Sequence, residues 1–352
     1  MKETMISFEK VSIVFGSEPE SALPLMDAGK SRAEVQEATG QILGAHDCSL
    51  EVAEGEISVL MGLSGSGKST LLRAINGLNK VTRGRMMVRA TDGKMVDVCT
   101  CSPATLRGLR RSAVSMVFQQ FGLLPWRSVV DNVALGLELS GLGRRERLEK
   151  AQSVLETVGL SAWGEKKVSE LSGGMQQRVG LARAFATDAP ILLMDEPFSA
   201  LDPLIRAHLQ DELLTLQEKM RCTIVFVSHD LEEAVKLGNT ITIMEGGRIV
   251  QSGRPEDIVL RPADDYVTDF VAHLNPLSVL RMVDVMTPCT GEPPARTLHG
   301  ETPLREVLPL FAEDPATAVL VTDAGGAALG EVTAARVFET LAPKVAGGTG
   351  GA

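Results

Sequence analysis

A run of small residues in the first part of the chain ends in a lysine and a serine. Gly62-Leu-Ser-Gly-Ser-Gly-Lys-Ser69 has the spacing G-x-x-x-x-G-K-[ST] of a phosphate-binding loop. Small residues let successive backbone N–H groups point at a polyphosphate, and the N-terminus of a following helix adds its dipole. Lys68 is expected to contact the β- and γ-phosphates, and the Ser69 hydroxyl to ligate Mg²⁺. A glycine-rich turn that matches by chance is disfavoured, because a strand-like run precedes the motif and a helical run follows it.

An acidic pair at the end of an apolar run is the second candidate. Ile191-Leu-Leu-Met-Asp195-Glu196-Pro197 predicts a buried strand that delivers two carboxylates to its carboxyl end. With a phosphate loop in the same chain, Asp195 is expected in the magnesium shell, and Glu196 is expected to polarise an attacking water. Alone, such a pair is more often a helix cap or a solvated turn. The phosphate loop reverses that preference.

Length, composition and charge exclude several classes of protein. The chain has 352 residues, of which 44% are hydrophobic and 23% charged, as in a soluble globular protein of about two domains. Forty-five acidic against 35 basic residues give a net charge of −10, the wrong sign for a protein that binds nucleic acid through its phosphates. The apolar runs are far shorter than the ~18 residues that cross a bilayer, and the first residues do not resemble a signal peptide. Five scattered cysteines indicate reduced thiols in a cytoplasmic setting.

The motifs lie between strands and helices that alternate along the chain. Residues 5–15 and 57–61 predict strands, the second of them directly before the phosphate loop. Residues 190–195 and 223–228 predict strands buried on both faces of a parallel sheet, with a helix over 203–220 between them. Strands that alternate with helices indicate an α/β fold.

Two stretches depart from this alternation. Residues 16–44 contain two prolines and a short helix over 30–39, capped at Ser31 and ended at Gly40, and are interpreted as an insertion. Residues 103–183 have a mostly helical composition. We therefore expect a helical subdomain within the α/β core.

A third motif carries a resemblance to a known family. Leu171-Ser-Gly-Gly-Met-Gln-Gln-Arg178 resembles the signature of ATP-binding-cassette (ABC) ATPases. Its serine and two glycines open a helix N-terminus, which is a further anion site. In the family, two cassettes pair head to tail, and the signature of one closes on the γ-phosphate held by the other. The resemblance therefore implies a homodimer.

Further elements of the family follow in order. Val117-Phe118-Gln119 resembles the Q-loop, whose Gln119 would contact Mg²⁺ and the attacking water. Ser199-Ala-Leu-Asp202 resembles the D-loop that crosses the dimer, and Val227-Ser-His229-Asp230 resembles the switch region, with His229 on the γ-phosphate. Phe15 stands where the family stacks an aromatic side chain on adenine. Singly, Phe15 could be core, His229 a strand-end histidine and Gln119 a surface amide; their order along the chain favours the family.

The resemblance implies ATP and Mg²⁺ as cofactors and assigns three groups of residues. The catalytic residues would be Glu196, His229 and Gln119. The nucleotide-binding residues would be Phe15, Gly62, Ser64, Gly65, Ser66, Gly67, Lys68, Ser69, Thr70, Ser172, Gly173, Gly174 and Asp202. The metal-binding residues would be Ser69, Gln119 and Asp195.

The expected fold is α/β: an ABC-type P-loop nucleotide-binding domain over residues 1–262, with the helical subdomain inside it. Residues 263–280 would form a linker and 343–352 a flexible tail. Between these, residues 281–342 would form a small α+β domain. Asp284-Val-Met-Thr-Pro288 and Gly330-Glu-Val-Thr333 resemble the ends of one cystathionine-β-synthase (CBS) repeat. The alternative is a plain dimer-promoting appendage.

The insertion narrows the resemblance to one class of importer. It is similar to one found in ATPases of glycine betaine, proline and choline importers, and Phe118-Gln-Gln-Phe-Gly-Leu-Leu-Pro-Trp-Arg127 is most similar to the choline branch. The expected function is an ATP hydrolase that drives uptake of choline or a related quaternary amine.

Its expected partners are a separate membrane permease and, through it, a periplasmic or lipid-anchored binding protein, with the subunit peripheral on the cytoplasmic face of the bacterial inner membrane. Three alternatives stay open: an importer ATPase for another small solute, a soluble ABC ATPase outside transport, and a regulatory binding module.

Overall fold

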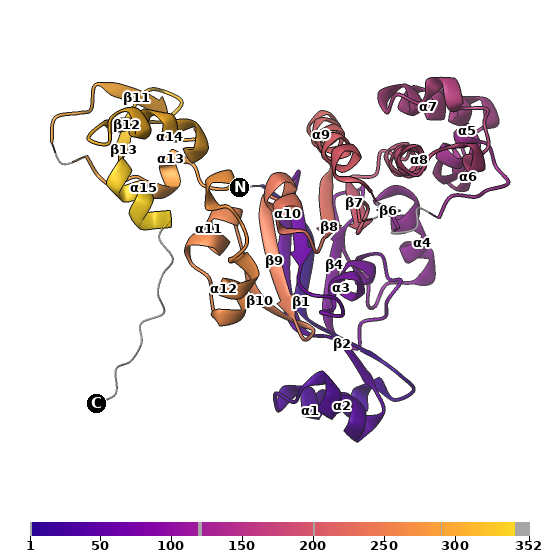
Figure 1. Ribbon diagram of the computed structural model, residues 1–352. Helices are drawn as coiled ribbons and strands as arrows, with labels where there is room; N and C mark the ends of the chain where they lie inside the picture. The colour runs from indigo at the N-terminus through magenta and orange to yellow at the C-terminus, as the bar shows by residue number, and fades with distance from the viewer. Residues whose placement is uncertain (1, 119–121, 200, 290, 342–352) are drawn as a thin grey trace. The chain divides into compact units, whose positions relative to one another are not determined.

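The computed structural model describes residues 2–118, 122–199, 201–289 and 291–341 (Figure 1). The chain divides into two compact units, Met1–Arg254 and Pro255–Ala352. The expected boundary after residue 262 therefore falls inside the second unit. The predicted linker over 263–280 contains a helix and a 3₁₀ turn, and the expected tail over 343–352 lies outside the described residues.

Two sheets form the framework of the first unit (Figure 1). Its strands are β1 (Thr4–Phe15), β2 (Ile42–Ala53), β3 (Ile57–Met61), β4 (Arg83–Arg89), β5 (Met95–Asp97), β6 (Val114–Val117), β7 (Ile191–Asp195), β8 (Thr223–Val227), β9 (Thr240–Glu245) and β10 (Arg248–Gly253). One sheet is antiparallel in the order β2-β1-β4-β5, and the other has the order β10-β9-β3-β8-β7-β6.

The six-stranded sheet gathers the carboxyl ends of its strands at one edge. Strands β3, β6, β7, β8 and β9 run parallel, and only the edge strand β10 is antiparallel. Since β3, β8 and β7 are neighbours, the loops that follow them lie together, as at the ligand-binding edge of other open α/β sheets. These loops carry the phosphate loop, His229 and Glu196.

Helices connect the strands of this unit. They are α1 (Leu23–Asp27), α2 (Arg32–Thr39), α3 (Lys68–Ile75), α4 (Pro103–Ser112), α5 (Val129–Val133), α6 (Leu135–Leu139), α7 (Arg144–Thr157), α8 (Gly173–Phe185), α9 (Pro203–Met220) and α10 (Leu231–Leu237), with 3₁₀ turns η1 (Pro19–Ala22), η2 (Ser161–Trp163) and η3 (Val168–Glu170). Helices α5 to α8 pack on one another and form the expected helical subdomain.

The range predicted to be helical also contains a strand. Val114–Val117 forms β6 and pairs in parallel with β7 at the edge of the larger sheet. Four residues directly after a helix show too short a pattern to be told from the end of that helix. Pairing with β7, a long-range contact, is what makes this segment a strand.

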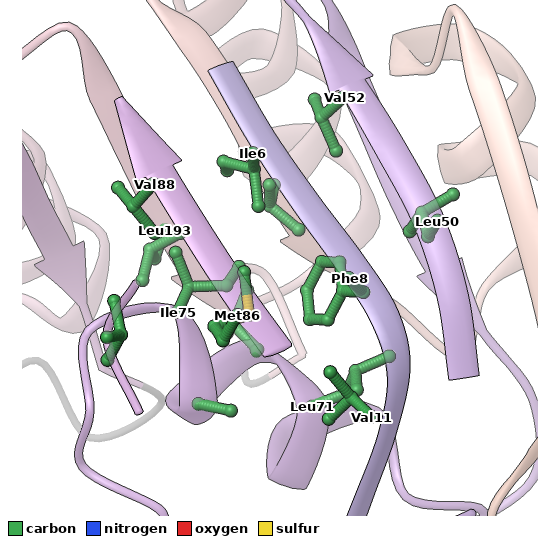
Figure 2. Packing of buried hydrophobic residues seen from close by; sticks show 14 of the residues in the cluster. Ile6, Phe8, Val11, Leu50, Val52, Leu71, Ile75, Met86, Val88 and Leu193 are labelled. Carbon is green, nitrogen blue, oxygen red and sulfur yellow. The ribbon is translucent and has the colours of Figure 1, made fainter. Parts of the chain in front are cut away.

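Helix α3 lies in the apolar core between the two sheets. Figure 2 shows this core close by, with Ile6, Phe8, Met86 and Val88 from the antiparallel sheet, Leu71 and Ile75 from α3 and Leu193 from β7. Burying one such side chain contributes about 1.5–3 kcal/mol. The packing fixes α3 against both sheets, and so it fixes Lys68 and Ser69 at the first turn of α3.

The insertion has the helix that the sequence predicts. Helix α2 begins after Ser31, whose hydroxyl accepts a hydrogen bond from the Glu34 backbone N–H at 3.3 Å, while the Glu34 carboxylate accepts one from the Ser31 N–H at 2.8 Å. This reciprocal capping box satisfies two backbone donors. Gly40 ends the helix with φ of 69°, a left-handed conformation that favours glycine.

The second unit is a small α+β arrangement. Its elements are α11 (Pro255–Leu260), α12 (Asp265–Val271), η4 (Pro276–Ser278), α13 (Met282–Val285), β11 (Arg296–His299), α14 (Leu304–Glu313), β12 (Ala318–Thr322), β13 (Ala328–Thr333) and α15 (Ala334–Leu341). The sheet has the order β11-β12-β13. The predicted strand at 318–322 is confirmed, whereas β11 was not predicted because its short segment is largely exposed. Throughout the described ranges, no helix is long and apolar enough to span a membrane.

Candidate functional site

The loop between β3 and α3 has a backbone that requires glycine. Gly62, Gly65 and Gly67 have φ of 139°, 79° and 104°, in the region that side chains disfavour. A Cβ on Gly62 would overlap the carbonyl oxygen of Met244, and one on Gly67 would lie 2.5 Å from that of Gly44. The glycines of the motif therefore allow the loop to curl against β9 and β2.

Lys68 is a buried cation that is held by carbonyl oxygens. Its Nζ donates hydrogen bonds to the carbonyls of Gly62 at 2.8 Å and Leu63 at 2.9 Å, and only 5% of the residue is exposed. Burial lowers the pKa of the Lys68 ammonium, while the nearby charges of Glu196 and Asp195 oppose that shift. A desolvated ammonium inside a loop of backbone amides is suited to an anionic ligand.

Asp195 connects the acidic strand to the phosphate loop. Its Oδ1 accepts a hydrogen bond from the Ser69 hydroxyl at 2.6 Å, and its Oδ2 accepts one from Arg73 Nε at 3.0 Å. Asp195 is 1% exposed, so its charge is balanced chiefly by the Arg73 guanidinium. Arg73 was not singled out from the sequence, although it lies one helical turn after Ser69 and thus on the same face of α3.

Glu196 and His229 face each other across the ends of β7 and β8. Nδ1 of His229 lies 3.6 Å from Oε2 of Glu196, and the Glu196 backbone N–H donates to the carbonyl of Val227 at 3.1 Å. Glu196 has φ of 48°, an uncommon conformation for a residue with a side chain. The pair combines a carboxylate that can accept a proton with an imidazole that can orient it.

Much of the phosphate loop, together with Glu196, borders a cavity of about 460 Å³, whereas Gly62, Asp195 and His229 are not in its lining. Its lining residues are Phe15, Arg32, Gln36, Ile42, Leu43, Gly44, Ser64, Gly65, Gly67, Lys68, Ser69, Thr70 and Glu196. Most of the predicted phosphate-loop residues, with Phe15 and Glu196, thus meet at one cavity. The contribution of the insertion and β2 was missed. The pairing of Phe15 with Ile42 explains it, since the chain returns from the insertion beside Phe15.

Comparison with known proteins connects this geometry to a family. A family model with the description "ABC transporter" matches residues 45–199. The glycine betaine/proline betaine transport system ATP-binding protein ProV of Escherichia coli is 49% identical over 272 residues, which cover 77% of this chain and 67% of ProV. The trimethylamine N-oxide transport system ATP-binding protein TmoW of Pelagibacter ubique is 40% identical over 345 residues, 97% of this chain and 98% of TmoW. The chain belongs to the family of ABC transporter ATP-binding proteins.

A solved structure supports the same fold for the ABC cassette of this chain. The dimeric structure of MJ0796, described as a bacterial ABC transporter cassette, matches with a TM-score of 0.59 and 30% identity. The match covers 71% of this chain and 99% of MJ0796. Membership of the family implies ATP binding and hydrolysis.

The ABC signature and the D-loop residue lie outside the lining of the phosphate-loop cavity. Ser172 caps α8 through a 3.4 Å hydrogen bond from the Met175 N–H, and Gly173 and Gly174 form its first turn. Asp202 caps α9 through a 3.1 Å bond from the Ile205 N–H. A Cβ on Gly174 would lie 3.2 Å from Ile205. The two helix starts therefore pack together. Gln119 falls outside the described residues.

The residues at and beside the phosphate-loop cavity fit a nucleotide with Mg²⁺. Hydroxyl and carboxylate oxygens are the ligands that Mg²⁺ prefers, and those of Ser69 and Asp195 are in direct contact. Ser66 Oγ is buried and has no hydrogen-bond partner among the described residues, so a donor or acceptor is available beside the loop. Phe15, 39% exposed, offers an aromatic face at the same cavity.

Proposed function

We propose that this chain is the ATPase subunit that drives uptake of a quaternary amine or a related methylamine through a separate membrane permease. The observation that carries the proposal is the similarity to TmoW, which extends over 97% of this chain. ProV and TmoW are described as ATP-binding proteins of transport systems for glycine betaine, proline betaine and trimethylamine N-oxide. These solutes share a methylated nitrogen.

Within this class of substrates, choline is the specific compound that we propose. It rests on the motif from Phe118 to Arg127, part of which lies outside the described residues. Choline and glycine betaine share a trimethylammonium group, so one binding protein with an aromatic cage could accept both. We therefore rank choline and glycine betaine as the first substrates to test.

The site residues have distinct proposed roles. Phe15 stacks on adenine, the backbone of the loop from Gly62 to Thr70 holds the phosphates, and Lys68 transfers its hydrogen bonds from loop carbonyls to the β- and γ-phosphates. Glu196 takes a proton from the attacking water. His229 contacts the γ-phosphate and, from its place beside Glu196, orients the carboxylate. Ser69 and Asp195, with Gln119, would hold Mg²⁺, which supplies charge neutralisation on the phosphates when bound.

The signature completes the site in a homodimer. Ser172, Gly173 and Gly174, at the start of α8, do not line the cavity of their own subunit. They would contact the γ-phosphate of a second copy. Asp202 would lie at the same junction. ATP binding would close the dimer and hydrolysis would reopen it, and the permease would move with each step.

Uptake measurements test the proposed function. Deletion of the gene from its own organism is expected to abolish uptake of radiolabelled choline, glycine betaine or trimethylamine N-oxide, because the permease loses its source of energy. The wild-type gene should restore uptake and Glu196→Gln should not. Undiminished uptake of all three solutes would contradict the transport proposal, while loss of uptake of an unrelated solute alone would contradict the substrate class.

We propose that residues 281–342, within the second unit, form a single CBS-like repeat that modulates transport. Its support is a two-way backbone pairing between Thr287 and Glu331, at 2.9 and 2.8 Å, which joins the two segments that resemble a CBS repeat. Removing Pro255–Ala352 is expected to preserve ATP hydrolysis by the assembled transporter and to alter its response to salt or to an adenine nucleotide. Complete loss of hydrolysis in a folded truncated protein would contradict this role.

A further inference from the structure

The insertion is anchored to strands of both sheets of the first unit. Asp27 accepts two hydrogen bonds from the Arg83 guanidinium, at 2.8 and 2.7 Å. Arg248 Nη2 donates to the Met26 carbonyl at 2.9 Å. A separate apolar cluster buries Val14, Ala22, Met26, Val35 and Leu43. These contacts hold α1 against Arg83 of β4 and Arg248 of β10, and the apolar cluster packs α1 and α2 on β1 and β2.

Arg32, the first residue of α2, extends from the insertion to the phosphate loop. Its guanidinium donates one hydrogen bond to the Gly65 carbonyl and another, at 3.0 Å, to the Gly44 carbonyl. Arg32 Nε is buried and has no hydrogen-bond partner among the described residues. Arg32 also lines the cavity with Lys68 and Ser69. The insertion thus places a cation across the mouth of the loop.

Arg32 differs from the neighbouring arginines in its charge partners. Within the ranges that the structure describes, no acidic side chain forms an ion pair with Arg32, whereas Arg73 pairs with Asp195 and Arg83 with Asp27. Burial lowers the pKa of the Arg32 guanidinium, although such a group stays charged at neutral pH. A partly desolvated cation with only carbonyl acceptors gains more from an anion than from those acceptors.

We propose that Arg32 is a phosphate-binding residue of the nucleotide site, supplied by the insertion. The proposal rests on the proposed function, since the anion is the pyrophosphate portion of ATP or ADP. The position of the Arg32 guanidinium favours the pyrophosphate portion, because both of its acceptors lie at the phosphate loop. Gly65 belongs to that loop. The Gly44 carbonyl lies beside Gly67 of the loop, since a Cβ built on Gly67 would be 2.5 Å from that carbonyl oxygen. On nucleotide binding, the guanidinium exchanges the two carbonyls for phosphate oxygens, which it can bind in a bidentate manner.

The competing explanation is a purely structural role, which we call a brace. As a brace, Arg32 only connects the phosphate loop to β2 through its two carbonyl contacts, and ATP displaces it. A brace and a phosphate ligand predict opposite effects of removing the side chain. Loss of a brace leaves nucleotide affinity unchanged or raises it, because ATP no longer competes with the two carbonyl contacts. Loss of a phosphate ligand lowers the affinity for nucleotides that carry a β-phosphate.

Titration of the full chain with ATP, ADP and AMP separates the two. The variants are Arg32→Ala, Arg32→Gln, which can still donate to carbonyls but has no charge, and Arg32→Lys. Arg32→Ala and Arg32→Gln are expected to weaken ATP and ADP binding about tenfold or more, with partial recovery in Arg32→Lys. AMP binding should change little. The matched control is Lys30→Ala, which removes a cation of the same insertion that pairs with Glu34 at 2.8 Å.

These titrations distinguish failure of the Arg32 assignment from failure of the proposed function. Unchanged or tighter ATP binding in Arg32→Gln, or an equal loss for AMP, would overturn the assignment of Arg32. If the wild-type chain does not bind ATP, or Lys68→Ala binds it normally, the proposed function fails instead. Thermal melting without nucleotide identifies a variant that does not fold. Arg32→Gln keeps a polar N–H donor of intermediate length without the charge, so it decides the matter if Arg32→Ala unfolds.

Discussion

Glu196→Gln is expected to bind ATP but to hydrolyse it at least about a hundredfold more slowly, because general base catalysis contributes roughly 10²–10⁴ in rate. The amide has the shape of the carboxylate and keeps a contact with His229, 3.6 Å away in the wild type, but it cannot accept a proton from water. It also removes a negative charge near the γ-phosphate. The ATP-bound dimer should therefore accumulate, which size-exclusion chromatography with Mg-ATP measures directly.

Glu218→Gln is the matched control for that experiment. Glu218 lies on α9, is exposed and does not line the cavity. The same change of charge there should leave both phosphate release and the elution volume as in the wild type. If Glu196→Gln hydrolyses ATP at nearly the wild-type rate, Glu196 is not the base and the proton must leave by another route.

Lys68→Ala is expected to abolish turnover and to weaken ATP binding by about a hundredfold or more. Charge-assisted hydrogen bonds contribute about 1.5–3 kcal/mol each, and a lysine in this loop would make them to two phosphates. The change also leaves the carbonyls of Gly62 and Leu63 without the buried donor that they have in the wild type. Titration with a fluorescent ATP analogue measures the affinity.

Lys219→Ala provides the control for Lys68→Ala. Lys219 is exposed on α9, so its removal changes the net charge equally without touching the loop. A thermal melt should show that the Lys68→Ala chain is folded before its affinity is interpreted. Unchanged affinity together with unchanged turnover would refute the assignment of the phosphate loop.

The parts of the site that the sequence predicts are those built from local patterns. The phosphate loop needs glycine at fixed positions, and the structure shows positive φ at Gly62, Gly65 and Gly67. The helix of the insertion needs a cap and a stop, and Ser31 and Gly40 provide both. Each of these features depends on residues a few positions apart, so its physical cause is visible in the sequence itself.

The parts that the sequence did not predict depend on contacts between distant segments. Strand β6 forms because it pairs with β7, which lies more than seventy residues later in the sequence. Arg32 reaches the cavity because one ion pair, one hydrogen bond to a carbonyl and an apolar cluster anchor the insertion on strands of both sheets. Arg73 pairs with Asp195 because β7 brings that carboxylate beside α3. No local periodicity encodes these distances. The signature on α8 does not line the cavity of its own subunit, so its proposed role depends on a second copy of the chain.

A crystal structure of Glu196→Gln with Mg-ATP would show directly whether two subunits share the nucleotide site. We expect a dimer with adenine on Phe15, Lys68 and Ser69 at the phosphates, and the residues from Ser172 to Gly174 of the partner subunit on the γ-phosphate. This expectation would be contradicted by a nucleotide bound away from the loop, or by a closed dimer in which Lys68 still donates only to the carbonyls of its own loop.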